Sequence, residues 1–288
     1  MTKRINQVAF ILEILLFALS VGILSFLAQN SLWILFFILL ALCIVLFATL
    51  QTIRTKPVFE RIRKLEEAEF RLAKRTQQSG ILDIYNMQDS VQQHERNEAT
   101  QDIITQGEVF SLLSLTAASY IDPGIKRHWD HLKPKIEEGA PFRLLLMNPF
   151  CKEKEVRDSL NNISLSYDSK SRLDLVVDLY NRYPNISVRF TSQCIYFAVF
   201  FTQSEMIYDP YHLGKIEDRI ENYFIALRIK KMEDSKGIKA KSYFNILKQH
   251  FEFLWITADD LETFFNKYQA QLANTPFKAL PIKSRYSP

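Results

Sequence analysis

Two apolar runs, VAFILEILLFALSVGILSFL at residues 8–27 and SLWILFFILLALCIVLFATL at residues 31–50, decide the architecture of this chain. Each run is about 20 residues long, which is the length that a helix needs to cross a bilayer. Only residues 28–30 separate them, so we expect the two helices to form a tight antiparallel hairpin. A cleaved signal peptide is the alternative for the first run, but a second run directly after it argues against that interpretation.

Basic residues flank the hairpin on one side of the membrane. Lys3 and Arg4 precede the first run, and the turn at residues 28–30 carries no charge. The basic residues that follow the second run are Arg54, Lys56, Arg61, Arg63 and Lys64. Because basic residues accumulate on the cytoplasmic side of a membrane, we expect a two-helix, multi-pass protein of the cell inner membrane with both termini in the cytoplasm.

The hairpin holds one ionisable residue, Glu13. Carboxylates within a membrane are costly and usually face a partner or water. Glu13 also lies close enough to the cytoplasmic end to reach the interface, so both interpretations stay open. Gly22, with Ala18 and Ser25, gives the first helix a face of small residues that permits close packing against another helix.

The composition favours a cytosolic domain and gives no sign of nucleic-acid binding. The chain has 288 residues, of which 48% are hydrophobic, with 36 basic and 32 acidic side chains. Only Lys3, Arg4 and Glu13 among these charges fall within the first 50 residues, so the remainder is nearly neutral. A nearly neutral domain lacks the positive field that attracts nucleic acid.

The cysteines and histidines predict no metal site. Cys43, Cys151 and Cys194 are far apart in the sequence, as in a protein of a reducing compartment. His128 and His131 lie one helical turn apart, but two histidines make an incomplete zinc site. We therefore expect no metal and no other cofactor.

A charged helical segment, VFERIRKLEEAEFRLAKRTQQ, follows Pro57 and ends at Gly80. The apolar residues at heptad spacing are Val58, Ile62, Leu65 and Leu72. Glu69 occupies the remaining core position, which leaves fewer than three clean heptads. We therefore expect a stalk helix that pairs weakly rather than a full coiled coil.

From residue 81 onward, short apolar runs alternate with helical segments. The expected strands are 81–85, 108–118, 142–150, 186–190, 195–201 and 205–211, with one more within 220–231. The expected helices are 89–106, 122–139, 152–163, 171–183, 241–255 and 258–272. Thr257 and Asp260 have the spacing of a capping box at the start of the last helix.

This alternation predicts one α/β domain with a mixed sheet and C-terminal helices. The expected organisation is a two-helix transmembrane anchor at 1–53, a helical stalk at 54–80 and a soluble ligand-sensing domain at 81–288.

The most suggestive segment is DPYHLGKIEDR at residues 209–219, which follows a buried strand. Ligands bind at such strand exits in α/β folds. Here the chain resembles the phospholipase-D-like fold over about residues 80–230, because the pieces match in kind and order. Those pieces are ILDIY, a polar helix, SLLSLTAASY, a helix with a glycine, RLLLMNPF, a long helix and the sheet that closes on DPYHLGK.

The resemblance implies a phosphate-binding pocket, but the motif departs from the active pattern. Active members carry His-x-Lys-x4-Asp, usually twice, with the histidine as covalent nucleophile and the lysine neutralising the phosphate. This chain has one copy, His212-x-x-Lys215-x-x-Asp218, with one residue too many before the lysine and two too few after it. We therefore expect a pocket that binds phosphate without cleaving it. A plain turn at Gly214 and intact hydrolase chemistry with His212, Lys215 and Asp218 as catalytic residues are the alternatives.

Donors to a bound anion are expected from the ends of the strands. The candidate ligand-binding residues are Ser114, Thr116, Ser119, Asn148, Tyr211, His212, Lys215 and Arg219. The first three are expected on the first long strand, with Ser119 directly after its expected range of 108–118. Tyr120 and Phe150 are candidates for stacking on a base, with a place in the core as the competing interpretation for each.

The arrangement of anchor, stalk and pocket resembles that of membrane effectors in prokaryotic nucleotide-signalling antiviral defence. The resemblance implies a cyclic nucleotide or other phosphorylated ligand, a cytoplasmic membrane partner and a homo-oligomer whose helices disrupt the membrane. A membrane-bound phosphodiesterase of the phospholipase-D superfamily and a non-enzymatic membrane scaffold are the alternatives.

Overall fold

The computed structural model describes residues 33–160, 167–211, 225–232 and 242–274, together with residues 17, 18, 20–23, 25, 26 and 29. The chain divides into two compact units, residues 1–75 and 76–288. The first unit contains both apolar runs, and the second contains the alternating strands and helices.

The first unit is dominated by one long helix, α2 (Trp33–Ser79). Its segment Trp33–Thr52 is the one stretch of the described chain that is long and apolar enough to cross a membrane, and none of it is buried within the protein. The hydroxyls of Thr49 and Thr52 donate to the carbonyls of Val45 and Ala48, so neither needs water within this segment. The helix therefore indicates membrane association.

The two-helix hairpin is not shown. The described residues of the first apolar run are helical, but Glu13 and most of that run lie outside the described residues. Helix α2 continues without a break through the segment expected to form the stalk and ends next to Gly80, which has a φ of +79°. A Cβ atom at Gly80 would lie 2.6 Å from the carbonyl oxygen of Lys230, so this position requires glycine.

The second unit is built on a mixed sheet, as the sequence predicts, with eight strands rather than the seven expected. The strands are β1 (Ile81–Asn86), β2 (Phe110–Ser114), β3 (Phe142–Met147), β4 (Ile186–Thr191), β5 (Phe197–Phe201), β6 (Glu205–Pro210), β7 (Ile225–Lys230) and β8 (Asp259–Asp260). Their order across the sheet is β1-β7-β6-β5-β2-β3-β4-β8. Strands β2, β3 and β4 are parallel, and the other neighbours are antiparallel. The carboxyl ends of β1, β2, β3, β4 and β6 therefore meet at one edge of the sheet, called here the carboxyl edge.

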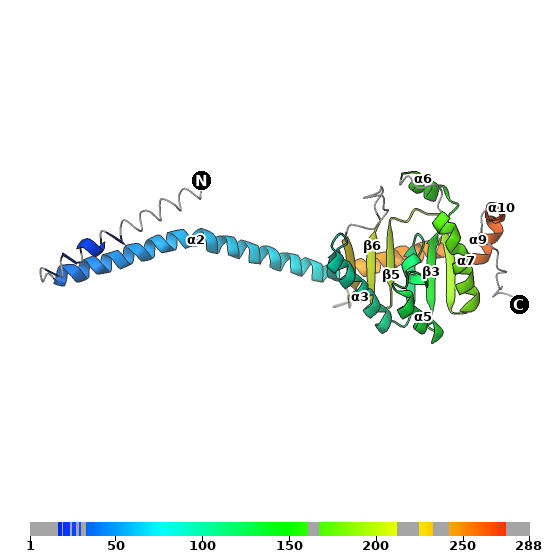
Figure 1. Ribbon diagram of the computed structural model, residues 1–288, viewed down its shortest axis with the longest axis horizontal. Helices are drawn as coiled ribbons and strands as arrows, with labels where there is room; N and C mark the ends of the chain where they lie inside the picture. Colours follow the sequence, from blue (N-terminus) through cyan, green and yellow to red (C-terminus); the bar gives the residue numbers. More distant parts are fainter. Residues whose placement is uncertain are drawn as a thin grey trace. The chain divides into compact units, whose positions relative to one another are not determined.

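Helices cover both faces of the sheet, as Figure 1 shows for α3, α5 and α7 in front and the orange helix α8 behind. The helices are α3 (Ser90–Gln106), α4 (Ala118–Ile121), α5 (Trp129–Glu137), α6 (Lys152–Leu160), α7 (Tyr167–Arg182), α8 (Tyr243–Thr257), α9 (Leu261–Lys267) and α10 (Gln269–Ala273). Leu112 and Leu144 pack in the core beneath α3, α5 and α7, whereas Leu113 and Leu145 pack in the core beneath α8. This alternation follows from the two-residue period of a strand. Strands buried on both faces are largely apolar, which explains the run FRLLLM in β3, where Arg143 is the one polar residue and is partly exposed.

Two expectations between β2 and β3 are wrong. The strand expected at 108–118 ends at Ser114, because Ala117 adopts a left-handed φ of +57° and starts the short helix α4. The helix expected at 122–139 begins only at Trp129. Asp122 instead accepts a hydrogen bond from the backbone of Gly124 at 2.8 Å, which is a turn that residues Pro123 and Gly124 favour.

The expected capping box at Thr257 is also wrong. Thr257 is the last residue of α8, and its hydroxyl donates to the carbonyl of Phe253 at 3.1 Å. The next helix begins at Leu261, with the Asp260 carboxylate accepting from the backbone N–H of Thr263 at 2.8 Å. The reason is that the residues between the helices pair with β4 as strand β8, which moves the start of the helix downstream.

Candidate functional site

Two of the expected ligand-binding residues, Ser114 and Tyr211, meet at the carboxyl edge. Their hydroxyl oxygens lie 3.2 Å apart, although 97 residues separate them in the sequence. The backbone N–H of Leu115 donates to the Tyr211 hydroxyl at 3.2 Å, and that of Ala117 donates to the Ser114 hydroxyl at 3.0 Å. Burial raises the pKa of Tyr211. Strands β2 and β6 are thus tied together where both leave the sheet.

Arg157 adds a positive charge to this place, and the sequence did not point to it. Its guanidinium lies 5.1 Å from the centre of the Tyr211 ring, in the geometry of a cation–π contact. Arg157 is buried, and burial lowers the pKa of its guanidinium. In the sequence it stands within the highly charged segment KEKEVRDSL, which resembles a solvent-exposed helix. Arg157 is nonetheless buried, as are Lys154 and Asp158 in the same helix, and the sequence does not show this burial.

Three other candidates do not match the expected arrangement. Thr116 and Ser119 lie outside strand β2, and the side chain of Asn148 is occupied by hydrogen bonds within the protein. Thr116 follows β2 rather than lying in it, and Ser119 belongs to α4, where its carbonyl accepts from the backbone of His128 at 3.0 Å. Asn148 follows β3 as expected, but its side chain is buried. It accepts from the backbone of Phe150 at 2.9 Å and donates to the Ser192 hydroxyl at 3.1 Å. Asn148 therefore shapes the loop after β3.

The remaining candidates, His212, Lys215, Asp218 and Arg219, lie outside the described residues. Strand β6 ends at Pro210, and Tyr211 is the last described residue before them. The roles of His212, Lys215, Asp218 and Arg219 therefore stay predictions.

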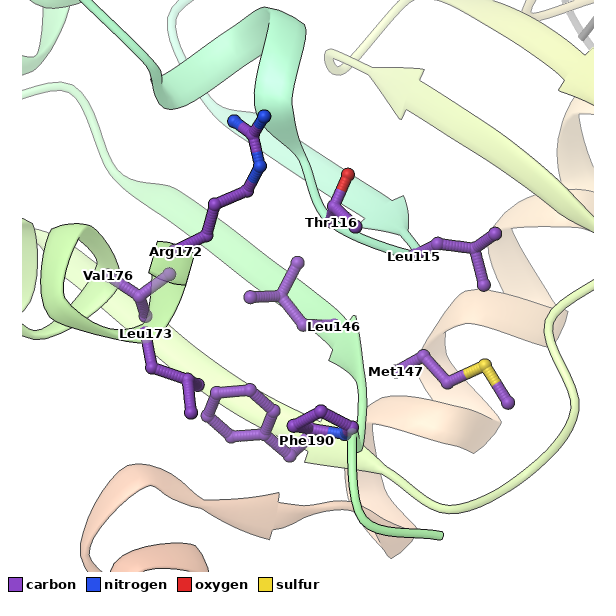
Figure 2. Close-up of a pocket in the computed structure, with 9 residues that line it drawn as sticks. Leu115, Thr116, Leu146, Met147, Arg172, Leu173, Val176 and Phe190 are labelled. Carbon is purple, nitrogen blue, oxygen red and sulfur yellow. The ribbon is translucent and has the colours of Figure 1, made fainter. Parts of the chain in front are cut away.

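A shallow hollow opens at the carboxyl ends of β2, β3 and β4 (Figure 2), and its cavity volume is only about 10 Å³. Its wall is apolar and is formed by Leu115, Leu146, Met147, Leu173, Val176 and Phe190. Two polar side chains, Thr116 and Arg172, also line it, and their polar ends point away from Phe190. The Arg172 guanidinium pairs with the Asp122 carboxylate at 2.8 Å and stays about a fifth exposed.

A buried polar cluster lies beside the carboxyl edge, under α3. Arg96 of α3 pairs with Asp209 of β6 through two hydrogen bonds, one of them 3.2 Å long between Nε and Oδ1. The Nη1 atom of Arg96 lies 3.1 Å from Nε2 of His128, and Nη2 lies 3.5 Å from the Tyr120 hydroxyl. All four side chains are buried. We call these four residues the Arg96 cluster.

The contacts within the Arg96 cluster determine its protonation states. Arg96 can only donate, so Nε2 of His128 must carry a lone pair and Nδ1 must carry the proton. Burial, together with the charge of Arg96, lowers the pKa of His128 to about 2. Burial also raises the pKa of Tyr120 to about 12. Burial opposes the charge on Arg96, but Asp209 and Tyr120 together outweigh it and raise the pKa of Arg96.

These states exclude chemistry at His128. The imidazole is neutral and fully buried, and its lone pair faces a guanidinium rather than a ligand. It therefore neither attacks a phosphate nor binds zinc with His131. Across the described ranges, no group of three His, Cys, Asp or Glu side chains is arranged to hold a metal ion. The Arg96 cluster therefore has a structural role, because it links α3, α4, α5 and the end of β6.

The protein is expected to lose stability below pH 6.5 because of His128. In that range the unfolded chain binds a proton on His128 that the folded chain excludes, down to the folded pKa of about 2. The contribution of His128 to stability is thus complete above pH 6.5. Below pH 6.5 the free energy of unfolding falls by about 1.4 kcal/mol for each pH unit. Urea unfolding at pH 7 and pH 5 should show that wild type loses about 2 kcal/mol more than His128→Gln, which accepts from Arg96 but does not titrate.

The matched control for this prediction is His94→Gln. His94 lies on the exposed side of α3, where about three quarters of its side chain is in solvent. We expect this variant to show the same pH dependence as wild type. Equal losses in wild type and His128→Gln would show that His128 does not titrate as its contacts require.

The two aromatic candidates for base stacking belong to the core. The Tyr120 ring is buried between Phe200 and His128, with ring centres 4.8 Å away on each side. Phe150 stacks on Phe264 at 6.0 Å and on Tyr268 at 5.5 Å. The competing interpretation, a place in the core, is therefore confirmed for the buried Tyr120, and the half-buried Phe150 packs against the core.

Comparisons with known proteins find no family. No protein-family model and no curated protein matches the chain. Among solved structures, the archaeal chromatin protein TrmBL2, described as having a novel mode of DNA binding, gives a TM-score of 0.34 at 13% identity over 74% of this chain and 69% of that one. Phosphatidylserine synthase of Haemophilus influenzae Rd KW20 gives 0.39 at 8% identity. That alignment covers 62% of this chain and 41% of the synthase, so the chain spans less than half of it. At these TM-scores neither likeness carries an argument about fold or function.

Proposed function

We propose that this chain is a membrane-anchored effector whose α/β domain binds a phosphorylated ligand at the carboxyl edge. The observation that carries the proposal is the meeting of Ser114, Tyr211 and Arg157 at this edge. They come from three distant segments, and Tyr211 directly precedes the segment with His212, Lys215 and Arg219 in the sequence. Hydroxyls and guanidinium groups are the donors that bind phosphate in proteins.

The side chains that line the hollow, rather than its small volume, favour a nucleotide as the ligand. A nucleotide joins a flat, largely apolar base to charged phosphates. The wall of Leu146, Leu173 and Phe190 offers apolar surface, and Arg172 and Thr116 offer polar ends. A few polar groups placed on an apolar wall are typical of small-molecule sites. A cyclic nucleotide is therefore the first ligand to test.

Binding without hydrolysis is the expected activity. His128, in the Arg96 cluster, is neutral and buried, with its lone pair facing Arg96. The remaining candidate nucleophile is His212, whose spacing to Lys215 and Asp218 departs from that of active enzymes. A nucleophile needs its charge-neutralising partner at a defined position. The shifted spacing therefore favours recognition over cleavage.

In this proposal the membrane segment is the part of the chain that acts on the membrane. Trp33–Thr52 supplies one membrane-crossing helix, and the first apolar run supplies a second in the proposed hairpin. Ligand binding would then control whether helices of several copies disrupt the cytoplasmic membrane, as in nucleotide-signalling antiviral defence. Both termini would lie in the cytoplasm, where the nucleotide is made.

Equilibrium dialysis of radiolabelled cyclic dinucleotides against the full-length protein in lipid nanodiscs tests the proposal. We expect retention of at least one nucleotide without turnover. Lys215→Ala and Arg219→Ala should each weaken its binding by about 1.5–3 kcal/mol, which is the contribution of a hydrogen bond to a charged group. Arg172→Ala should also weaken nucleotide binding.

The matched control is Lys267→Ala, which removes a half-exposed charge from α9. This variant should bind as wild type does. Equal nucleotide binding by wild type, Lys215→Ala and Arg219→Ala would show that these two side chains do not bind the ligand. Hydrolysis that disappears in His212→Ala would favour the phosphodiesterase, and retention of no nucleotide would favour the scaffold.

A further inference from the structure

The second half of helix α2 exposes a row of apolar side chains outside the segment that is apolar enough for the membrane. Its members are Val58, Ile62, Leu65 and Leu72, and we call them the heptad seam. Between 46% and 70% of each side chain is exposed. A helix that leaves such a row in water gains little stability by itself, because most helical stability comes from packing an apolar face. The heptad seam is therefore a surface that a partner would cover.

The spacing of the heptad seam fits another helix. The intervals of four, three and seven residues place all four side chains on one face that follows a left-handed coiled coil. Along α2 the seam extends over about 21 Å, at 1.5 Å for each residue. Phe59 lies beside the seam and is also exposed, which widens its apolar surface.

We infer that the heptad seam pairs with the same seam of a second copy in a parallel coiled coil. The reason for choosing a second copy is that α2 is continuous from Trp33 to Ser79. Copies inserted in one membrane through Trp33–Thr52 present their seams in the same direction and at the same height. Anchoring also raises the effective concentration of one seam at another. This inference stands whether or not the α/β domain binds a nucleotide.

Charges beside the seam fit the parallel arrangement. In the heptad register set by Ile62 and Leu65, Arg61 is a g residue and Glu66 is the e residue that faces it from a parallel partner. Two such pairs form in a parallel dimer, whereas an antiparallel dimer places like charges together. Arg63 and Glu67 pair within one helix at 3.5 Å on the outer face. The charges thus specify both partner and direction.

Glu69 limits the strength of this pairing. It occupies the core position between Leu65 and Leu72, where two carboxylates from the two copies would face each other. A polar residue at one core position fixes register and oligomeric state and lowers stability. The coiled coil is therefore expected to be weak enough for the anchor to decide whether it forms.

Disulfide crosslinking of the full-length protein in native membranes tests the inference. Single cysteines are introduced on the seam (Ile62→Cys, Leu65→Cys) and on the outer face (Arg63→Cys, Glu67→Cys), and wild type reports the background of its own cysteines. Facing core positions in a parallel dimer are close enough for a disulfide, and outer positions are not. We expect about tenfold more crosslinked dimer from the seam variants than from the outer variants. Equal yields, or higher yields from the outer face, would overturn the inference.

Two further variants separate a specific seam from chance collision. Glu69→Leu should raise the association constant of labelled copies, measured by energy transfer in vesicles, by about tenfold, or ~1.4 kcal/mol. Arg61→Glu should lower it, and the added change Glu66→Arg should restore it. An association constant that Glu69→Leu leaves unchanged, or a charge reversal without restoration, would contradict a parallel seam.

Discussion

Replacing Asp209 by alanine is expected to lower the free energy of unfolding by about 3–5 kcal/mol, because the charge of Arg96 would remain buried without its partner. Only 7% of the Arg96 side chain and 8% of the Asp209 side chain are exposed, so water cannot replace the lost contact. Arg96→Met should cause a loss of the same size from the other side. Since domains are stable by only about 5–15 kcal/mol, either variant removes a large share of the total.

Replacing both residues at once distinguishes a buried ion pair from a packing defect. Arg96→Met with Asp209→Leu removes both charges, and a buried pair exchanged for apolar groups is often neutral. The double variant should therefore be more stable than either single variant, although Tyr120 and His128 lose a donor. Urea unfolding of the full-length protein measures all three. As a control, Arg182→Ala breaks an exposed pair with Asp178 and should change stability by less than about 1 kcal/mol. Single variants as stable as wild type would contradict a structural role for the Arg96 cluster.

The centre of the sheet was predictable because its strands are buried on both faces. FAVFF in β5 is a continuous apolar run, FRLLLM in β3 is interrupted only by Arg143, and such runs between helical segments indicate an α/β fold. The end of the stalk at Gly80 was predictable for a similar reason, since glycine accepts the left-handed conformation found there. In both cases a local pattern determines the local structure.

The Arg96 cluster was not predictable, because nothing local marks it. Arg96 stands in SVQQHERNEATQDIITQ, a polar segment whose charged residues resemble those of a solvent-exposed helix. Its partner Asp209 is 113 residues away, on a strand whose position beside α3 depends on the whole topology. The turn from Ala117 to His128 was missed for a related reason. Its path is set by the packing of Tyr120 on Phe200, which is a contact between distant segments.

The second large effect is expected in the membrane, where the bound ligand should change whether the helices cause a leak. A ligand shifts an equilibrium only by its different affinity for the two states. A preference of about 100-fold corresponds to ~2.7 kcal/mol, which is enough to change the dominant state. Gly22→Leu should abolish the resulting leak without altering nucleotide binding, because it blocks close packing of the small-residue face.

The structure supports Gly22 as the position for this test. A Cβ atom there would meet no described atom within 4 Å, so leucine is tolerated within one copy and acts on contacts with other helices. Val21→Leu adds bulk to an exposed position next to that face and should leave the leak intact. Loss of leak in both variants would point to a general defect of insertion rather than to close packing.

Dye release from vesicles that contain the full-length protein tests the central claim most directly. A nucleotide that equilibrium dialysis shows to be bound is added, and release of an entrapped dye is measured with and without it. We expect release to differ between the two states, and the difference to disappear in Gly22→Leu. Equal release in both states, from protein that is folded, inserted and loaded with nucleotide, would contradict the effector and leave the scaffold in its place.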